Sequence, residues 1–490
     1  MRMRALLAAI GVVGAMVPMA VQATADTIVA CQAPTVDMEF EQAAIDETRA
    51  GGGPILETLQ DGTLLWGSHA GTTHFYSPTV ADQTSAAFVQ NYEGQTYQYW
   101  SDDDGATWHF SPRNAIQSAE QGSLAGVNNS GFSAPVFAED MAGNVFISEI
   151  NLANIAVSKS EDSGRTWTLQ NFFGLTVSDR QWMAADEEDV VYMTANGFGG
   201  GSLGNTVPGA GNLGNYIYKS SDGGVTWSRG HSTGGSSSSD IKVDWNTGAV
   251  YQPQQSNGLR LAVWPNARAE DFSSTPTVEY HTIFDGYRQQ SSIGPTIELD
   301  DAGNIYATWD QDSGNADYPP GIYFAASQDG GKNWTEPVRV DEGPEHSFWP
   351  WLEVGAEGAV GIAWLENENV IPSENAEDAA ADSGWHVMAA QTFDAFGNDD
   401  ADCGVAGFNV VQASTAPVHH GTVCTGGTVC QARAVDRRLG DYFGNEIASG
   451  GGMVIAVSDT QQGGSVALPL GIRQVAGPSF TEPGVILTRD

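Results

Sequence analysis

One octapeptide, repeated four times, constrains the fold of this chain more than any other feature. It follows the pattern Ser-x-Asp-x-Gly-x-Thr-Trp, with Asn in place of Thr in the last copy, and it spans residues 101–108, 160–167, 220–227 and 327–334. The aspartate suits a tight turn because it accepts backbone N–H groups, and the glycine adopts a positive φ at little cost. Each copy therefore predicts a hairpin turn. The aspartates expected to be structural are Asp103, Asp162, Asp222 and Asp329.

The spacing of the octapeptides predicts the size of the repeating unit. Their first serines stand at 101, 160, 220 and 327, at intervals of 59, 60 and 107 residues. The last interval corresponds to roughly two somewhat shorter units, so a degenerate copy is expected near residue 270, within 259–272. An apolar strand, a glycine turn and a second strand recur at 54–67, 134–148, 182–194, 241–252, 295–309, 350–364 and 443–457. Seven such units predict an all-β, seven-bladed propeller, with six blades as the alternative if one terminal unit is incomplete.

The octapeptide resembles the Asp box, or BNR repeat, of sialidase-like propellers, and the resemblance extends from about Gly51 to Val457. It implies a secreted protein that acts on glycans. Sialidases of this type hold the substrate carboxylate with three arginines and use a tyrosine nucleophile paired with a glutamate, together with an acid/base aspartate. Their first arginine lies in a Phe/Tyr-Arg-Ile-Pro motif. Here the corresponding residues 51–56 read Gly-Gly-Gly-Pro-Ile-Leu, so the proline matches and the arginine is absent.

Polar residues near the starts of the first strands are the candidate site, because these starts converge on one face of a propeller. The resemblance suggests Tyr442 as nucleophile, Glu446 as its partner and Asp240 as acid/base. The candidate substrate-binding residues are Arg180, Arg288, Arg437, Arg438, His346, Trp182, Trp349 and Asp441. Arginine binds carboxylates in a bidentate manner, so the expected ligand is an acidic sugar or another carboxylate. The alternative is that these arginines pair with neighbouring aspartates and that the tryptophans belong to the blade core.

The start of the chain is typical of an export signal. Arg2 and Arg4 precede an apolar stretch, and residues 23–25 form a small-x-small cleavage site. We expect a signal peptide over 1–25, with an uncleaved anchor as the alternative, then an N-terminal segment over 26–50. The propeller is expected over 51–490, with a cysteine-bearing insertion at about 394–438. Outside the signal, residues 39–49 alone carry a weak helical periodicity.

The composition is strongly acidic, with 60 Asp and Glu against 20 Lys and Arg and a net charge of −40. This charge excludes nucleic acid and anionic membranes as partners and favours a soluble monomer. No pattern requires a cofactor. Calcium is compatible with acidic runs such as 300–301 and 310–317, although none has EF-hand spacing. The pair His419–His420 is interpreted as an ordinary surface pair.

Four cysteines occur in the chain, and an even number in an exported protein indicates disulfides. We expect Cys424 to bond Cys430, which is close in sequence, and Cys31 to bond Cys403. The second bond is one way to close the ring, and a shared terminal blade is another. A zinc site is the rival interpretation, but the spacings match no zinc pattern.

Three classes of function remain open from the sequence. The first is a glycan-acting hydrolase of the exo-α-sialidase type with a non-standard site. The second is a non-catalytic propeller that binds carbohydrate or protein, and the third is a structural or cell-surface protein. The sequence contains no Gly-x-Ser-x-Gly elbow, no phosphate-binding glycine loop and no His-Glu-x-x-His motif.

Overall fold

The computed structural model describes residues 33–69, 96–111, 133–151, 154–173, 179–198, 213–235, 239–290, 294–397, 405–426, 430, 435–440, 443–462, 464 and 466–489. The expected signal peptide and four of the predicted residues, Cys31, Cys403, Asp441 and Tyr442, lie outside these ranges. Within them the fold is all-β, apart from the 3₁₀ turn η4 (Ala376–Asp378). No helix of the described part is long and apolar enough to cross a membrane.

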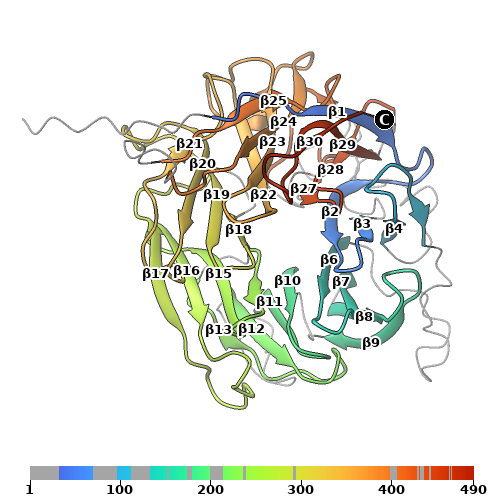
Figure 1. Cartoon of the computed structure of the whole chain (residues 1–490), viewed down its shortest axis with the longest axis vertical. Coiled ribbons are helices and arrows are strands. Elements are labelled where there is room, and N and C mark those ends of the chain that lie inside the picture. Colours follow the sequence, from blue (N-terminus) through green and yellow to red (C-terminus); the bar gives the residue numbers. More distant parts are fainter. Residues whose placement is uncertain are drawn as a thin grey trace, which may run out of the picture.

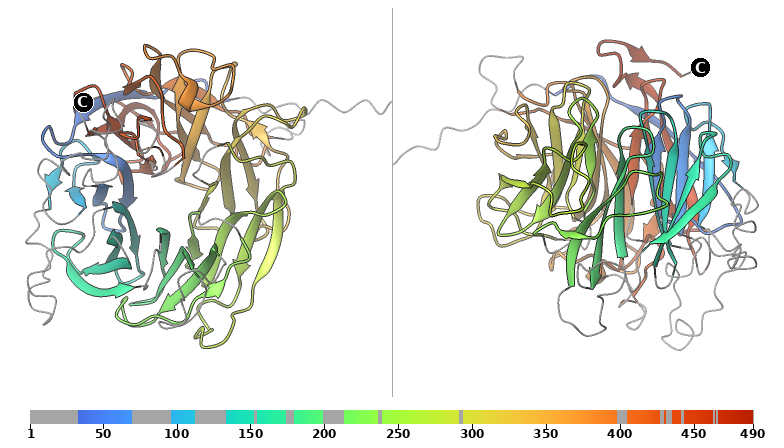
Figure 2. Two further views of the ribbon diagram at one scale, coloured as in Figure 1. Left: turned by 180° about the vertical axis from the view of Figure 1, so that it is seen from behind. Right: turned by 90° about the horizontal axis from the view of Figure 1, so that it is seen from below.

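Seven antiparallel sheets stand in a ring around a central channel (Figures 1 and 2), which confirms the seven-bladed propeller. In blades one to seven the innermost strands are β2 (Gly52–Thr58), β6 (Ser133–Glu139), β10 (Asp179–Ala185), β14 (Lys242–Asp244), β18 (Thr296–Leu299), β22 (Ser347–Val354) and β27 (Gly444–Ile447). The second strands are β3 (Leu64–His69), β7 (Val145–Asn151), β11 (Val191–Phe198), β15 (Ala249–Gln255), β19 (Ile305–Gln311), β23 (Val360–Asn367) and β28 (Met453–Asp459). These pairs are the seven repeats found in the sequence.

The outer strands complete each blade in chain order. The third strands are β4 (Tyr97–Ser101), β8 (Asn154–Ser160), β12 (Leu213–Ser220), β16 (Leu259–Trp264), β20 (Gly321–Ser327), β24 (Gly384–Thr392) and β29 (Leu468–Pro478). The fourth strands are β5 (His109–Phe110), β9 (Thr168–Phe173), β13 (His231–Ser232), β17 (Glu279–Phe284), β21 (Val338–Arg339), β25 (Asn409–Gln412) and, in the seventh blade, β1 (Glu39–Ala44). Two short strands, β26 (His419–His420) and β30 (Ile486–Leu487), add to β24 and β29.

The ring closes in the seventh blade, where the first described strand pairs with the last long one. β1 lies antiparallel to β29, with Gln42 opposite Ile472, and the Ile45 N–H continues this pairing to the Pro469 carbonyl at 2.9 Å. The shared terminal blade therefore closes the ring, and the segment 26–50 contributes a strand to the propeller. The weak helical cue over 39–49 is wrong because pairing with β29 outweighs local periodicity.

The octapeptides form hairpin turns between the third and fourth strands of their blades, as predicted. In all four copies the aspartate Oδ1 accepts a backbone N–H four residues ahead at 2.7–2.9 Å. The serine hydroxyl accepts the glycine N–H at 2.9–3.0 Å. The hairpin between β16 and β17 occupies the position expected of the degenerate copy.

The cysteine-bearing segment before the seventh blade belongs largely to the sixth. β25 and β26 both pair with β24, and the predicted bond between Cys424 and Cys430 is present. His419 is not a surface residue: it is buried, and its Nδ1 lies 2.8 Å from the Thr460 hydroxyl. His420 next to it is exposed.

Candidate functional site

The innermost strands repeat one polar position around the channel. Glutamate directly precedes the last residue of the strand in blades one, five, six and seven, as Glu57, Glu298, Glu353 and Glu446. In the fourth blade Lys242 of β14 projects into the same space, whereas β6 and β10 carry the small residues Ala138 and Ala184 at this level. The propeller symmetry thus gathers four carboxyl groups that are far apart in the sequence.

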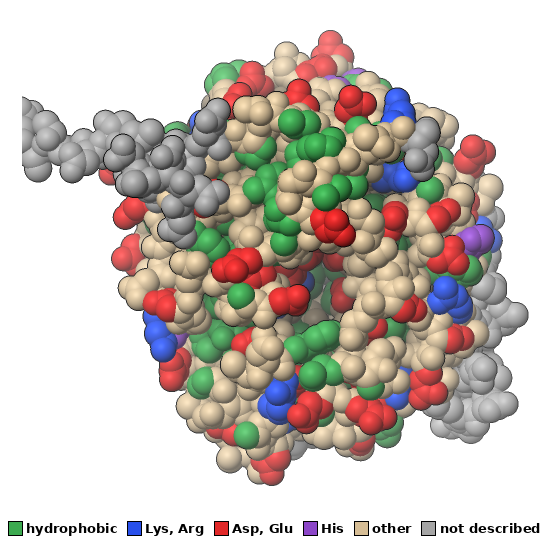
Figure 3. Space-filling view, in the orientation of Figure 1, with side chains coloured by type: hydrophobic (Ala, Val, Ile, Leu, Met, Phe, Trp, Pro, Cys, Tyr) green, Lys and Arg blue, Asp and Glu red, His purple; other side chains and the backbone are tan. Residues whose placement is uncertain are grey.

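These side chains surround a cavity of about 290 Å³ in the channel. Nine acidic residues and one lysine are among the described residues that line it, together with the aromatic side chains of Phe137, Trp182 and Trp351. The turns that join the first and second strands of blades four and five contribute Asn246 and Asp301 to its wall. The cavity therefore reaches the face that carries these turns, where the molecule is visibly hollowed between acidic side chains (Figure 3).

Lys242 holds one side of the cavity together. Its ammonium group forms an ion pair with Glu298 and lies 3.8 Å from Asp240. Burial alone would lower the pKa of Lys242, but Asp240 and Glu298 raise it well above its usual range. The lysine therefore stays charged, and it offsets part of the negative charge of this wall.

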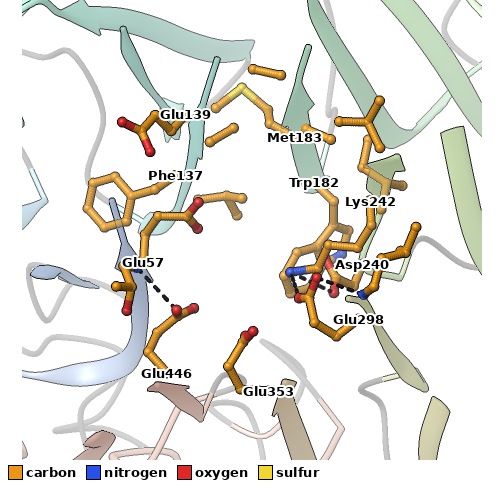
Figure 4. Close-up of a pocket in the computed structure, with 18 of the residues that line it drawn as sticks. Glu57, Phe137, Glu139, Trp182, Met183, Asp240, Lys242, Glu298, Glu353 and Glu446 are labelled. Carbon is orange, nitrogen blue, oxygen red and sulfur yellow. Dashed lines mark hydrogen bonds and ion pairs between the residues drawn. The ribbon is translucent and has the colours of Figure 1, made fainter. Parts of the chain in front are cut away.

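Three glutamates form the opposite side (Figure 4). Glu446 accepts the Thr58 N–H at 3.1 Å, which joins the seventh blade to the first. Burial, followed by repulsion from Glu446, raises the pKa of Glu57 well above its usual range. Burial and the charges of Glu298 and Glu446 do the same to the pKa of Glu353. Glu57 and Glu353 are only partly buried, so water in the channel reaches both side chains while the carboxyl groups repel one another.

Two of the channel carboxyl groups have pKa values close to neutral pH. Burial raises the pKa of Asp240 to about 7, with Lys242 opposing and Glu298 adding to the shift. Burial also raises the pKa of Glu446 to about 7, again against Lys242 and with Glu298. Groups with a pKa near 7 can donate or accept protons at physiological pH. The channel therefore has the chemistry of a general acid and base.

An aromatic pair also borders the cavity. The Trp182 and Trp351 rings have centroids 5.6 Å apart and planes tilted by 34°. They are only 4% and 7% exposed, so most of each ring is blade core, and the part that remains borders the cavity. This pair fits both interpretations offered for the tryptophans.

The structure brings together three of the predicted site residues, Asp240, Glu446 and Trp182, in one cavity. The predicted arginines are not among the described residues that line it. Arg438 instead binds Asp436, with Nη2 and Oδ2 2.6 Å apart, and donates to the carbonyls of Thr460 and Gly464. Arg437 is only 3% exposed. Arg438 therefore pairs with a neighbouring aspartate, which is the alternative interpretation given for these arginines.

Two of the remaining predicted residues lie near the starts of first strands. Arg180 and Trp349 occupy equivalent bulge positions in blades three and six, and both have positive φ, 52° and 55°. Trp349 is buried core. Arg288 is outside the channel, where its carbonyl accepts the Asp312 N–H.

His346 borders a separate cavity of about 410 Å³ between the fifth and sixth blades. Its ring nitrogens lie 3.1 and 3.2 Å from the Gln290 amide nitrogen, and burial lowers its pKa to about 4. A neutral histidine in this position does not supply a positive charge for a carboxylate ligand.

Sequence reasoning missed Glu57, Lys242, Glu298 and Glu353. The signal was present in the aligned units, because each residue interrupts an otherwise apolar first strand at nearly the same distance from its turn. A search for charge at the starts of the first strands does not find these residues, because they stand at or near the other ends of their strands.

Among the described residues, one cluster brings three candidate metal-ligand atoms within reach of a single ion. It consists of Glu377, Cys424 and Cys430, and both of its sulfurs are used in the disulfide. The acidic run at 300–301 serves its turn, where Asp300 accepts the Asn304 N–H at 2.9 Å.

No family model matches the sequence, and no curated protein matches it. Among solved structures, the chain is similar to the phage phi92 endosialidase, at 12% identity and a TM-score of 0.47, covering 92% of this chain and 71% of that one. It is also similar to the intramolecular trans-sialidase of Ruminococcus gnavus, at 13% identity and a TM-score of 0.39, covering 88% and 96%. A protein of unknown function from Dyadobacter fermentans has 11% identity and a TM-score of 0.40, covering 90% and 99%. The fold assignment stands on the strand pairing described above.

Proposed function

We propose that this protein is a secreted, glycan-acting propeller that cleaves a glycosidic bond in its central channel. The observation that carries the proposal is the presence of Asp240 and Glu446 in one cavity, each with its pKa raised to about 7. Ordinary surface carboxyls are ionised at neutral pH and cannot act as acids there. Two carboxyl groups with pKa values of about 7 can supply the protonated and the ionised carboxyl that glycoside hydrolysis needs.

The chemistry divides between a protonated and an ionised carboxyl group. The protonated group gives its proton to the glycosidic oxygen as the bond to the anomeric carbon breaks. The ionised group removes a proton from the water that attacks the anomeric carbon, so the second carboxyl ends protonated and the first ends ionised. Lys242 stabilises the ionised form on its side of the cavity because it pairs with Glu298 and lies close to Asp240.

A cavity of about 290 Å³ is at the lower end of the roughly 300–1,000 Å³ typical of small-molecule sites, and it suits one sugar residue. The Trp182 and Trp351 edges provide an apolar border of the kind on which sugar rings pack. The sialidase form of this function needs a cationic pocket for a carboxylate, and the described channel is acidic instead. Its arginines would have to act outside this cavity, because the predicted arginines are not among the described residues that line it.

The test is hydrolysis of a panel of fluorogenic glycosides by the purified mature protein. The panel covers neutral, amino and acidic sugars, including an α-sialoside, between about pH 4 and pH 8. We expect turnover of a non-acidic glycoside, and we expect Asp240→Asn and Glu446→Gln each to reduce it by roughly 10²–10⁴-fold, the usual worth of general acid–base catalysis.

Glu188→Gln is the matched control, because Glu188 is exposed in the turn between β10 and β11 and its loss changes the net charge equally. Turnover that survives in both channel variants would contradict channel catalysis. Release of sialic acid that disappears in Tyr442→Phe and Arg438→Ala would place the activity outside this cavity. Binding of a glycan without any turnover would leave the non-catalytic propeller.

A further inference from the structure

The wall of the channel is almost entirely acidic, and this negative charge restricts the kind of ligand that can bind. Its wall contains nine acidic residues against Lys242 among the described residues, and the lysine is already engaged with Glu298. A sugar that carries a carboxylate would be repelled by these acidic side chains, and the low dielectric inside the channel strengthens the repulsion. A sugar that carries a positive charge would be attracted by the same groups.

The carboxyls are distributed around the cavity instead of converging on one point. Within the described residues, no three carboxyl oxygens of the channel lie close enough together to hold a single metal ion. Figure 4 shows Glu57, Glu353 and Glu446 on one side and Asp240 and Glu298 on the other, with space between them. This arrangement suits a cationic group on an extended molecule better than a bare ion.

A second feature of the cavity, independent of the acidic residues, also suits a sugar. Trp182 and Trp351 border the cavity, and their ring centroids are 5.6 Å apart. The edges that remain exposed provide an apolar border against which the face of a sugar ring can pack.

From these features we infer that the channel selects an amino sugar, a pyranose ring that bears a primary ammonium group. This inference deepens the proposed function, on which it rests, by naming the substrate class. The ammonium group bonds to the carboxyl groups of the channel wall, and the face of the pyranose ring packs against the exposed edges of Trp182 and Trp351.

The raised pKa values in the channel make proton release a test of the same assignment. Burial and the charge of Glu446 raise the pKa of Glu57, and burial with the charges of Glu298 and Glu446 raises that of Glu353. Burial, with the charge of Glu298 adding to it, raises the pKa of Glu446 to about 7, so Glu446 is partly protonated at neutral pH. An ammonium group between them would favour the ionised forms and expel protons into the solvent. A neutral sugar would leave the protonation of the channel unchanged.

The experiment is isothermal titration calorimetry of the full mature protein with glucosamine, glucose, N-acetylglucosamine and N-acetylneuraminic acid at pH 7. Each titration is run in two buffers of different ionisation enthalpy. We expect glucosamine to bind about 10- to 100-fold more tightly than glucose, as charge-assisted hydrogen bonds allow, and to release protons. Acetylation of the amine should abolish both effects, because it removes the charge.

The variant Glu353→Gln should weaken glucosamine binding at least about fivefold and reduce the preference for glucosamine over glucose, since it removes a carboxylate that an ammonium group would pair with and keeps the shape. Glu188→Gln in an exposed turn is again the control. Equal affinity for glucosamine and glucose, or tighter binding of N-acetylneuraminic acid, would overturn the inference. So would a calcium titration that releases the same protons while glucosamine releases none.

Failure of the inference is distinguishable from failure of the proposed function. Hydrolysis of neutral glycosides with no preference for the amine would retain channel catalysis and reject the amino sugar. Selective binding of glucosamine with no cleavage of any glycoside would reject catalysis and retain the ligand class. Thermal unfolding of each variant separates a changed ligand preference from a changed fold.

Discussion

Carboxyl groups serve opposite purposes at two places in this molecule. In the octapeptide hairpins they are satisfied: partial burial disfavours the charge of Asp162, but hydrogen bonds from Thr166 and Ser160 outweigh it and lower its pKa. In the channel they are crowded, and burial with like charges raises the pKa of Glu446. The hairpin aspartates stabilise their turns, whereas the channel carboxyl groups repel one another, and a positively charged ligand would reduce that repulsion.

The crowded groups make a prediction about stability and pH. The folded state binds more protons at Asp240 and Glu446 than the unfolded chain does between their usual pKa values near 4 and their folded values of about 7. Their contribution to stability is therefore complete below about pH 4 and lost as the pH rises through about 7. The lowered aspartates of the hairpins act in the opposite sense, but below this interval.

We expect the free energy of unfolding, measured in urea, to fall from about pH 5 to about pH 7.5, and Glu446→Gln to reduce this slope by up to ~1.4 kcal/mol per pH unit. Glu188→Gln should leave the slope as it is. An identical slope in Glu446→Gln and the parent protein would show that Glu446 titrates normally.

At the level of elements, the closing strand makes the seventh blade vulnerable at one bond. The Ile45 N–H donates to the Pro469 carbonyl at the end of the β1–β29 pairing. A proline at position 45 would have no N–H to make this hydrogen bond. We expect Ile45→Pro to lower stability by about 2–3 kcal/mol and to promote aggregation through the β29 edge. Thermal unfolding and size-exclusion chromatography measure both effects.

Ile45→Val keeps the N–H and most of the apolar contact, and should cost about 0.5–1.5 kcal/mol without aggregation. Equal behaviour of the two variants would mean that side-chain packing, and not the strand pairing, closes the ring.

Local sequence explains the hairpins and blades well, and the closure and the site poorly. The octapeptide defines its turn within eight residues, so Asp162 and Gly164 could be assigned from the pattern alone. β1 could not, because its partner lies more than 400 residues away and its own residues carry a helical cue. The carboxyl ring required knowledge that Glu57 and Glu446 belong to neighbouring blades, which follows only after the ring is closed.

At the level of the whole molecule, the net charge of −40 opposes the compact state. Salt shortens the range of this repulsion from about 10 Å at 0.1 M to about 3 Å at 1 M. We therefore expect the unfolding temperature to rise as sodium chloride is increased over this range, recorded by differential scanning calorimetry with potassium chloride as the comparison. A rise that needs only millimolar calcium would instead establish a specific calcium site, and an unchanged unfolding temperature would show that the surface charges are already screened.

The pairing of β1 with β29 also has a consequence for synthesis and export. A chain that leaves the ribosome or crosses a membrane amino end first presents β1 at once, but the strand beside which it belongs arrives almost last. Six blades can assemble in chain order before the seventh, and β1, the outer strand of the seventh blade, stays unpaired during that time. The channel with its ring of carboxyls is therefore complete only when the carboxyl end of the chain has emerged, and a prematurely shortened chain never encloses it.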